Sequence, residues 1–94
     1  MYLVKNIGNN LNMKMKVSQA VATRIREILT EKNMTQYRLE MNSGLSKGTL
    51  TSLMYARYNG VNLTTLITII RTLGISVDEF FKSPLFNEEN LDCD

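Results

Sequence analysis

Residues 35–55 read TQYRLEMNSGLSKGTLTSLMY, and this stretch decides the fold. Thr35 and Ser46 each carry a side-chain oxygen that can cap the first turn of a helix. Gly44 lies between them and supplies the left-handed conformation that ends a helix. The apolar positions of the two segments are Leu39, Leu45, Leu50, Leu53 and Met54. The pattern predicts two short helices joined by a tight turn.

The second of these helices, at about residues 46–56, carries the informative chemistry. Two short helices with this spacing form a helix-turn-helix pattern. Because the major groove of DNA admits one α-helix, the second helix would be the one that reads base edges. Its exposed positions combine one cation, several hydroxyl groups and no acid: Ser46, Lys47, Gly48, Thr49, Thr51 and Ser52. The lack of an acid favours a phosphate-rich partner, whereas the plainer alternative is an αα-hairpin in a helical bundle.

Apolar stripes predict a longer helix on each side of this pair. Ser18 is a good N-cap, and the helix after it would end near residues 32–33. Its stripe consists of Val21, Ile25, Ile28 and Leu29. Asn62 and Gly74 bracket the other helix. The stripe of that helix consists of Leu63, Leu66, Ile67, Ile70 and Leu73.

A fifth, short helix completes the predicted domain. Residues 76–79 read SVDE, a capping box that would open a helix with Phe80 or Phe81 facing inward. Ser83-Pro84 would close the domain. No stretch predicts a strand convincingly. The fold class is therefore all-α, with five helices around one shared core.

The chain divides into three segments: a flexible arm (1–16), a helix-turn-helix domain (17–83) and an acidic tail (84–94). Residues 1–77 carry a net charge of +7 and residues 78–94 a net charge of −5. The arm, rich in asparagine, could contact DNA or a partner subunit, although Met13 or Met15 could also be the natural start. The tail could be solvated, or it could pack on a partner or on the domain.

Composition argues against an enzyme, so no catalytic residue, cofactor or metal is expected. The chain has no histidine and one cysteine, Cys93, which removes the commonest general base and any internal disulfide or zinc cluster. No glycine-rich cofactor loop of the Rossmann or P-loop type is present. No apolar run approaches the ~18 residues of a membrane span, and no signal peptide is recognisable, which leaves the cytoplasm as the expected location.

The chain resembles the phage-repressor/Cro type (XRE-like) of helix-turn-helix transcriptional regulators over about residues 17–81. The family's recurring string has its counterpart here in Thr35-Gln36, Leu39, Gly44 and Ser46. Residues 73–81, LGISVDEFF, are similar to the family's ending of Leu-Gly-Val-Ser-x-Asp-Glu-Leu-Phe. The resemblance implies a five-helix lambda-repressor-like domain, sequence-specific binding of double-stranded DNA and repression as a homodimer.

The resemblance also implies roles for single residues. Gln36, after Thr35, matches a position that contacts the phosphate backbone, and Tyr55 and Arg57 lie where the family often contacts phosphate. Lys47, Gly48 and Ser52 match positions that face base edges, with Thr49 adjacent. Gly48 has no side chain to read a base and would allow close approach of the backbone. The predicted DNA-binding residues are Thr35, Gln36, Ser46, Lys47, Gly48, Thr49, Ser52, Tyr55 and Arg57.

Three positions depart from the family's pattern. Glu40 replaces a small alanine, so its carboxylate would turn outward or pair with a cation, or the angle between the two helices would differ. The connection from Met54 to Leu66 is one residue longer than usual and lacks a proline. Leu29 and Met54 stand where relatives pair an arginine with a glutamate, which fits an apolar replacement of a buried ion pair.

The leading hypothesis is therefore a sequence-specific regulator, a repressor that binds duplex DNA as a homodimer. The alternative is an antitoxin-type or other protein-interaction module whose acidic tail binds a partner protein. No membrane association is expected.

Overall fold

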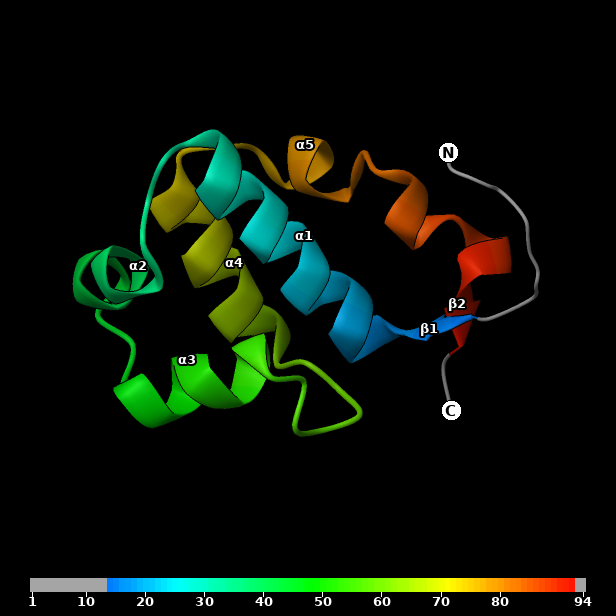
Figure 1. Cartoon of the computed structure of the whole chain (residues 1–94), viewed down its shortest axis with the longest axis horizontal. Helices are drawn as coiled ribbons and strands as arrows, with labels where there is room; N and C mark the ends of the chain where they lie inside the picture. The colour runs from blue at the N-terminus through cyan, green and yellow to red at the C-terminus, as the bar shows by residue number, and fades with distance from the viewer. Residues whose placement is uncertain (1–13, 93–94) are drawn as a thin grey trace.

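Five α-helices form the body of the protein, as the computed structural model shows over residues 14–92 (Figure 1). The helices are α1 (Val17–Glu31), α2 (Gln36–Ser43), α3 (Lys47–Met54), α4 (Leu63–Leu73) and α5 (Val77–Phe81). Two single-turn 3-10 helices follow, η1 (Pro84–Phe86) and η2 (Glu88–Asn90). The predicted all-α, five-helix class is confirmed. Most of the predicted arm, residues 1–13, lies outside the described residues.

Local capping sets where the helices after α1 begin and end. The side chains of Thr35, Ser46, Asn62 and Ser76 each accept a hydrogen bond from the backbone N–H three residues further on. Gly44 and Gly74 have φ values of 76° and 77°, the left-handed conformation that ends a helix at little steric cost. These predictions from the sequence are confirmed, and they hold α2 and α3 as two separate short helices.

The predicted start of α1 is wrong. The N-cap is Lys16, and the backbone N–H of Lys16 donates to Oε1 of Gln19 at 3.0 Å. Ser18 lies inside the first turn and is only 3% exposed, so its side chain belongs to the interior. Capping propensity indicated Ser18, but packing against the rest of the domain decided the boundary.

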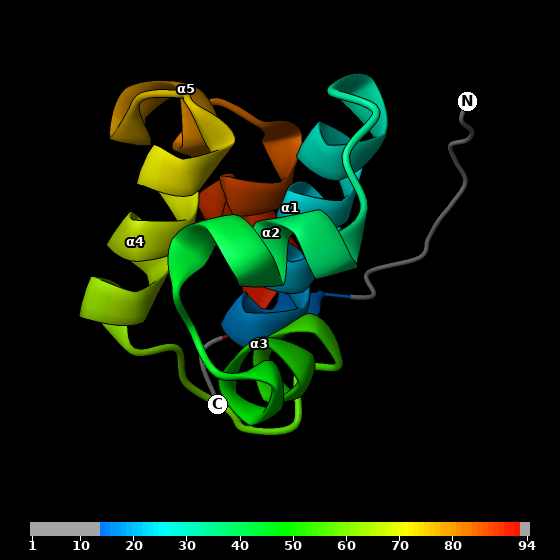
Figure 2. The same ribbon diagram turned by 90° about the vertical axis from the view of Figure 1, so that its left-hand side faces the viewer.

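One hydrophobic core joins the helices. Its centre is formed by side chains that are almost entirely buried: Ile25, Leu39, Leu50, Ile69, Ile70 and Phe80. In the predicted pair at α5, Phe80 is the inward residue, whereas Phe81 is 38% exposed. In the packing, α2 contacts α4 and α3 contacts α1, so α3 lies along one edge of the molecule (Figures 1 and 2).

Two arginines of α1 bind the carbonyl ends of other helices. The guanidinium group of Arg24 donates to the carbonyl oxygens of Phe80, at 2.7 Å, and Glu79, at 2.9 Å, in α5. Arg26 donates to the carbonyl oxygen of Met54 at the end of α3. Because the last carbonyls of a helix lack partners within the helix and carry partial negative charge, these cations stabilise the ends of both helices.

The segment after α5 packs on the domain. The Phe86 ring lies 4.8 Å from Phe81 and 5.8 Å from Phe80, measured between centroids. Asn90 Nδ2 donates to the carbonyl oxygen of Pro84 at 2.8 Å. Of the alternatives that the sequence left open for the tail, packing on the domain is the one observed for Phe86. We call residues 84–92 the C-terminal strap.

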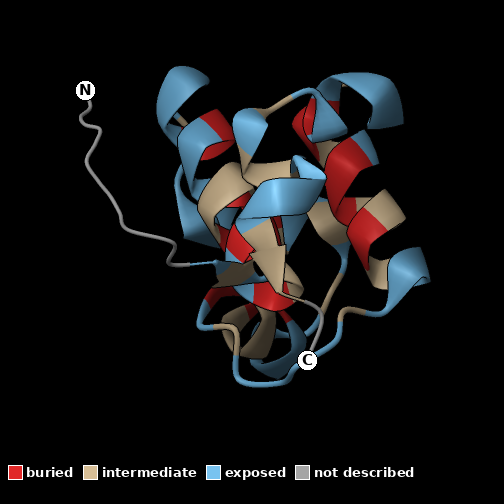
Figure 3. Ribbon diagram, turned by 90° about the vertical axis from the view of Figure 1, so that its right-hand side faces the viewer, coloured by how far each residue is buried: buried red, intermediate tan, exposed pale blue. Residues whose placement is uncertain are grey.

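A short parallel strand pair joins the two ends of the described chain, although the sequence predicted no strand. In this pair β1 (Met15–Lys16) lies beside β2 (Leu91–Asp92), with Met15 opposite Leu91 and Lys16 opposite Asp92. Figure 3 shows this side of the molecule, where the strand pair adjoins the first turn of α1. Two-residue strands leave no periodicity in a sequence, and their pairing joins residues 76 positions apart, so local pattern carries no signal for them.

Candidate nucleic-acid interface

The outer face of α3 presents polar groups without an acid. Lys47, Gly48 and Thr49 are exposed, Ser52 is half-buried, and Leu50 and Met54 point into the core. The Ser46 hydroxyl donates to Thr49 Oγ1 at 2.8 Å and accepts from the Thr49 backbone N–H at 3.1 Å. This arrangement fixes the first turn of α3 and leaves the Thr49 hydroxyl proton able to donate outward.

A hollow of about 530 Å³ lies between α3 and the segment that connects α3 to α4. Four predicted site residues line it: Ser46, Gly48, Thr49 and Ser52. Tyr58, in the connection, and Thr65, in α4, also line it, although the sequence pattern does not mark them as site residues. A Cβ atom added at Gly48 would meet nothing within 4 Å, so the lack of a side chain there keeps the surface open. The hollow therefore offers hydroxyl groups from both sides to a ligand.

The far end of α3 carries the predicted pair Tyr55 and Arg57. Both are exposed, and the Arg57 guanidinium lies 5.7 Å from the centre of the Tyr55 ring. Ala56 between them has a φ of 51°, which turns the chain out of the helix. The backbone N–H of Arg57 donates to the carbonyl oxygen of Ser52 at 3.0 Å, so Arg57 is held beside the end of the helix.

The remaining predicted residues, Thr35 and Gln36, lie at the start of α2. Thr35 caps that helix, and Gln36 is its exposed first residue. The structure thus groups Ser46, Gly48, Thr49 and Ser52 around one hollow. It places the other predicted residues on exposed ends of α2 and α3.

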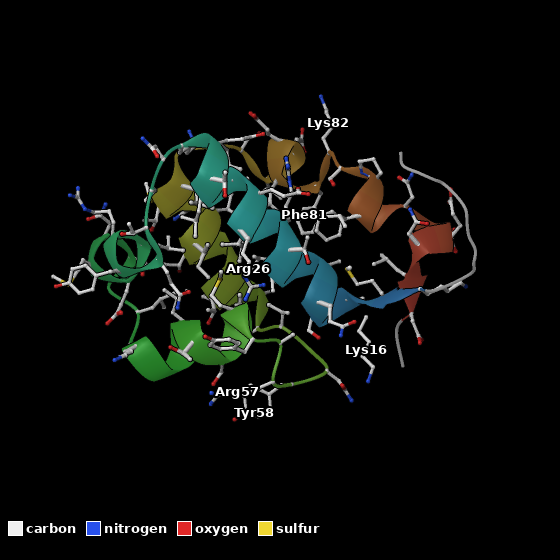
Figure 4. All side chains as sticks on the ribbon, viewed as in Figure 1. Lys16, Arg26, Arg57, Tyr58, Phe81 and Lys82 are labelled. Carbon is white, nitrogen blue, oxygen red and sulfur yellow. The ribbon has the colours of Figure 1, made fainter. Side chains whose placement is uncertain are left out.

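Lys16 is a cation near this surface that sequence reasoning missed. Its Nζ donates to Oδ1 of Asn59, in the connection between α3 and α4, at 3.3 Å. Figure 4 shows Lys16 on the same side of the molecule as Arg57 and Tyr58, with Lys82 at the opposite edge. The one available signal was a cation directly before the first helix. The stronger capping propensity of Ser18, two residues further on, obscures that signal.

The structure shows the environment of two departures from the family pattern, Glu40 and the pair Leu29 and Met54. Glu40 is half-buried, and within residues 14–92 the salt bridge found is Arg24–Glu27, so the Glu40 carboxylate has no cationic partner there. Leu29 and Met54 are both buried in the core cluster, as expected for an apolar replacement of an ion pair.

Two short helices at a fixed turn, the second exposing hydroxyls and a lysine at the edge of a helical core, define a helix-turn-helix DNA-binding domain. A family profile described as the Cro/C1-type HTH DNA-binding domain matches residues 24–84. The chain belongs to this family. It is accordingly a DNA-binding transcription regulator rather than an enzyme.

Solved structures agree with this assignment. The prophage Lp1 protein 11 is 33% identical, with a TM-score of 0.71, and the match covers 81% of this chain and 99% of that one. A mutant of the restriction-modification controller protein C.Esp1396I is 26% identical, with a TM-score of 0.65, covering 74% of this chain and 87% of that one. No curated protein sequence matches the chain. Within residues 14–92, no helix has the length and apolar character needed to cross a membrane.

Proposed function

We propose that the protein is a sequence-specific repressor that places α3 in the major groove of duplex DNA and binds as a homodimer. The observation that carries the proposal is the acid-free outer face of α3. There Lys47, Thr49 and Ser52 lie near Gly48, and the space in front of Gly48 is empty. A lysine and hydroxyl groups are suited to donate to base edges. Occupying an operator in this way would exclude the transcription machinery.

Two groups of residues would divide the work. Lys47 and Ser52, helped by Thr49, would read bases. Lys is a common partner of guanine O6 and N7, and each good contact is worth about 1–3 kcal/mol of discrimination. Thr35, Gln36, Tyr55 and Arg57 would hold the phosphate backbone, which sets position and orientation without reading sequence. Ser46 would act mainly through the hydrogen bonds that fix Thr49.

The alternative, a module whose tail binds a partner protein, has less support. That function needs the apolar residues of the tail to be accessible. Phe86 instead packs on the core cluster, and Leu85 is half-buried. The exposed acids Glu88 and Glu89 remain on the surface of the strap but carry no apolar neighbour on η2.

The test is a selection of binding sites from random duplex DNA, followed by affinity measurements on the selected site. We expect a two-fold symmetric consensus whose half-sites lie about one helical turn apart. Arg57→Glu should greatly weaken binding. Lys82→Glu makes the same change of charge at the opposite edge of the molecule and is the matched control (Figure 4). No enriched duplex, or equal losses from both variants, would contradict the proposal.

A further inference from the structure

Lys16 stands where three parts of the chain meet. It is the N-cap of α1, it pairs with Asp92 in the strand pair, and its Nζ reaches Asn59 in the α3–α4 connection. It is exposed and forms no salt bridge within residues 14–92. Among the described residues, its ammonium group donates a 3.3 Å hydrogen bond to a neutral amide, the side chain of Asn59. An anionic oxygen would be a stronger acceptor for this ammonium group.

We propose that Lys16 is a further DNA-backbone contact and that the C-terminal strap positions it. The inference rests on the proposed function, because it assumes that the side of the molecule carrying α3, Arg57 and Tyr58 faces the duplex. Lys16 lies on that side, and its link to Asn59 holds the ammonium group next to the α3–α4 connection (Figure 4). A phosphate oxygen beside Asn59 would then accept a charge-assisted hydrogen bond from Nζ.

The strap is built to hold the segment before α1. Its Phe86 ring packs against Phe80 and Phe81, and its Asn90 side chain closes on Pro84. These contacts place β2 beside β1. Lys16, in β1, has an extended backbone with φ −65° and ψ 152°. Without β2, Lys16 would have to be ordered at the moment of DNA binding, and that ordering costs conformational entropy.

If the strap positions Lys16, removing part of the acidic tail should change DNA affinity in the direction opposite to that expected from charge alone. Removing negative charge from a DNA-binding protein should by itself strengthen binding. If the strap positions Lys16, removing β2 should weaken binding although two acids, Asp92 and Asp94, are lost with it. A gain in affinity on removing β2 would therefore indicate a purely electrostatic effect of the tail, whereas a loss would indicate that the strap positions Lys16.

The experiment measures affinity for the selected duplex over a range of salt concentrations. The variants are Lys16→Gln, a chain that ends after Asn90, and the combination of the two. Glu88→Gln with Glu89→Gln is the matched control, since it removes two exposed acids and keeps β2. We expect Lys16→Gln to weaken binding by about threefold and to reduce the salt slope by about one for each copy bound. The shortened chain should lose as much, and the combined variant should lose no more.

The charge control should bind at least as tightly as the parent. Lys16→Gln changes an exposed side chain, so it tests the contact even if the shortened chain melts early. Binding and salt slope unchanged by Lys16→Gln would overturn the contact. A shortened chain that binds more tightly, or losses that add in the combined variant, would overturn the role of the strap. If the parent protein binds no duplex, the proposed function itself is contradicted. That outcome is distinguishable from the two outcomes that would overturn the Lys16 contact or the role of the strap.

Discussion

The guanidinium group of Arg26 in α1 donates a hydrogen bond to the carbonyl oxygen of Met54, the last residue of α3. This contact connects the longest helix of the domain to the C-terminal end of the helix that we propose reads DNA. The carbonyl end of a helix carries partial negative charge, so the bond is charge-assisted. It therefore links α1 to the C-terminal end of α3.

Removing that contact should destabilise the domain. We expect Arg26→Ala to lower the free energy of unfolding by about 1–2 kcal/mol, because a hydrogen bond to a charged group is lost and a carbonyl loses its partner. Arg26→Lys keeps the charge and should recover part of the loss. Chemical denaturation measures both. A free energy of unfolding unchanged in Arg26→Ala would show that the contact does not stabilise the fold.

Leu29 and Met54 should be coupled through the core. Both are buried, at 7% and 2% exposed. Leu29→Arg alone would bury an unpaired charge and should cost about 3–5 kcal/mol, whereas adding Met54→Glu should restore much of it by forming an ion pair. Thermal unfolding of the two single variants and the double variant tests this coupling. Additive losses in the double variant would show that the two positions do not interact.

Lys47 and Arg57 should differ in what they contribute to DNA binding. Lys47→Ala should relax the preference at one or two base pairs of each half-site, because a base contact is lost. Arg57→Ala should weaken binding about equally on all sequences and flatten the salt slope by about one unit. Site selection with each variant at two salt concentrations tells them apart. If Lys47→Ala leaves the selected motif unchanged while Arg57→Ala changes it, the proposed register of α3 on DNA is wrong.

The aromatic packing of the strap should contribute to stability. Phe86 contacts Phe80 and Phe81 and is half-buried. Phe86→Ala should therefore cost about 1–3 kcal/mol, less than a fully buried phenylalanine would. Phe86→Leu keeps most of the apolar volume and is the control. If Phe86→Ala unfolds at the same denaturant concentration as the parent, the strap does not hold to the domain in solution.

Gly48 should tolerate a side chain. Its backbone is not in the left-handed region, and an added Cβ meets nothing within 4 Å. Gly48→Ala should raise the free energy of unfolding by about 0.5 kcal/mol or more, because glycine in a helix is disfavoured relative to alanine. Thermal or chemical unfolding measures the change. A loss of stability would indicate that α3 packs more closely there than the structure shows.

The elements that could be predicted from the sequence are those decided within a few residues. The caps at Thr35, Ser46, Asn62 and Ser76 satisfy N–H groups three residues away, so local chemistry specified them. The stripe of α4 was predicted only in part. Leu66, Ile70 and Leu73 are buried as expected, whereas Leu63 is 67% exposed and Ile69, which the predicted stripe omitted, is fully buried. The grouping of Ser46, Gly48, Thr49 and Ser52 followed from the helix that carries them.

What could not be predicted depends on segments far apart in the sequence. Ser18 was misassigned because its environment is set by packing, not by its own propensity. The strap and the strand pair depend on Phe86 meeting Phe81 and on β2 meeting β1. Lys16 was missed for the same reason, since its neighbour Asn59 is 43 residues away.

The open surface at Gly48 has an evolutionary consequence. A new side chain on a DNA-reading helix has to avoid clashes with neighbouring groups and must not weaken the helix. At Gly48 both conditions are met, since the space in front of the helix is unfilled and the change to a larger residue favours the helix. A single codon change there could alter operator preference in one step, which would let duplicated copies of such a regulator diverge without an unstable intermediate.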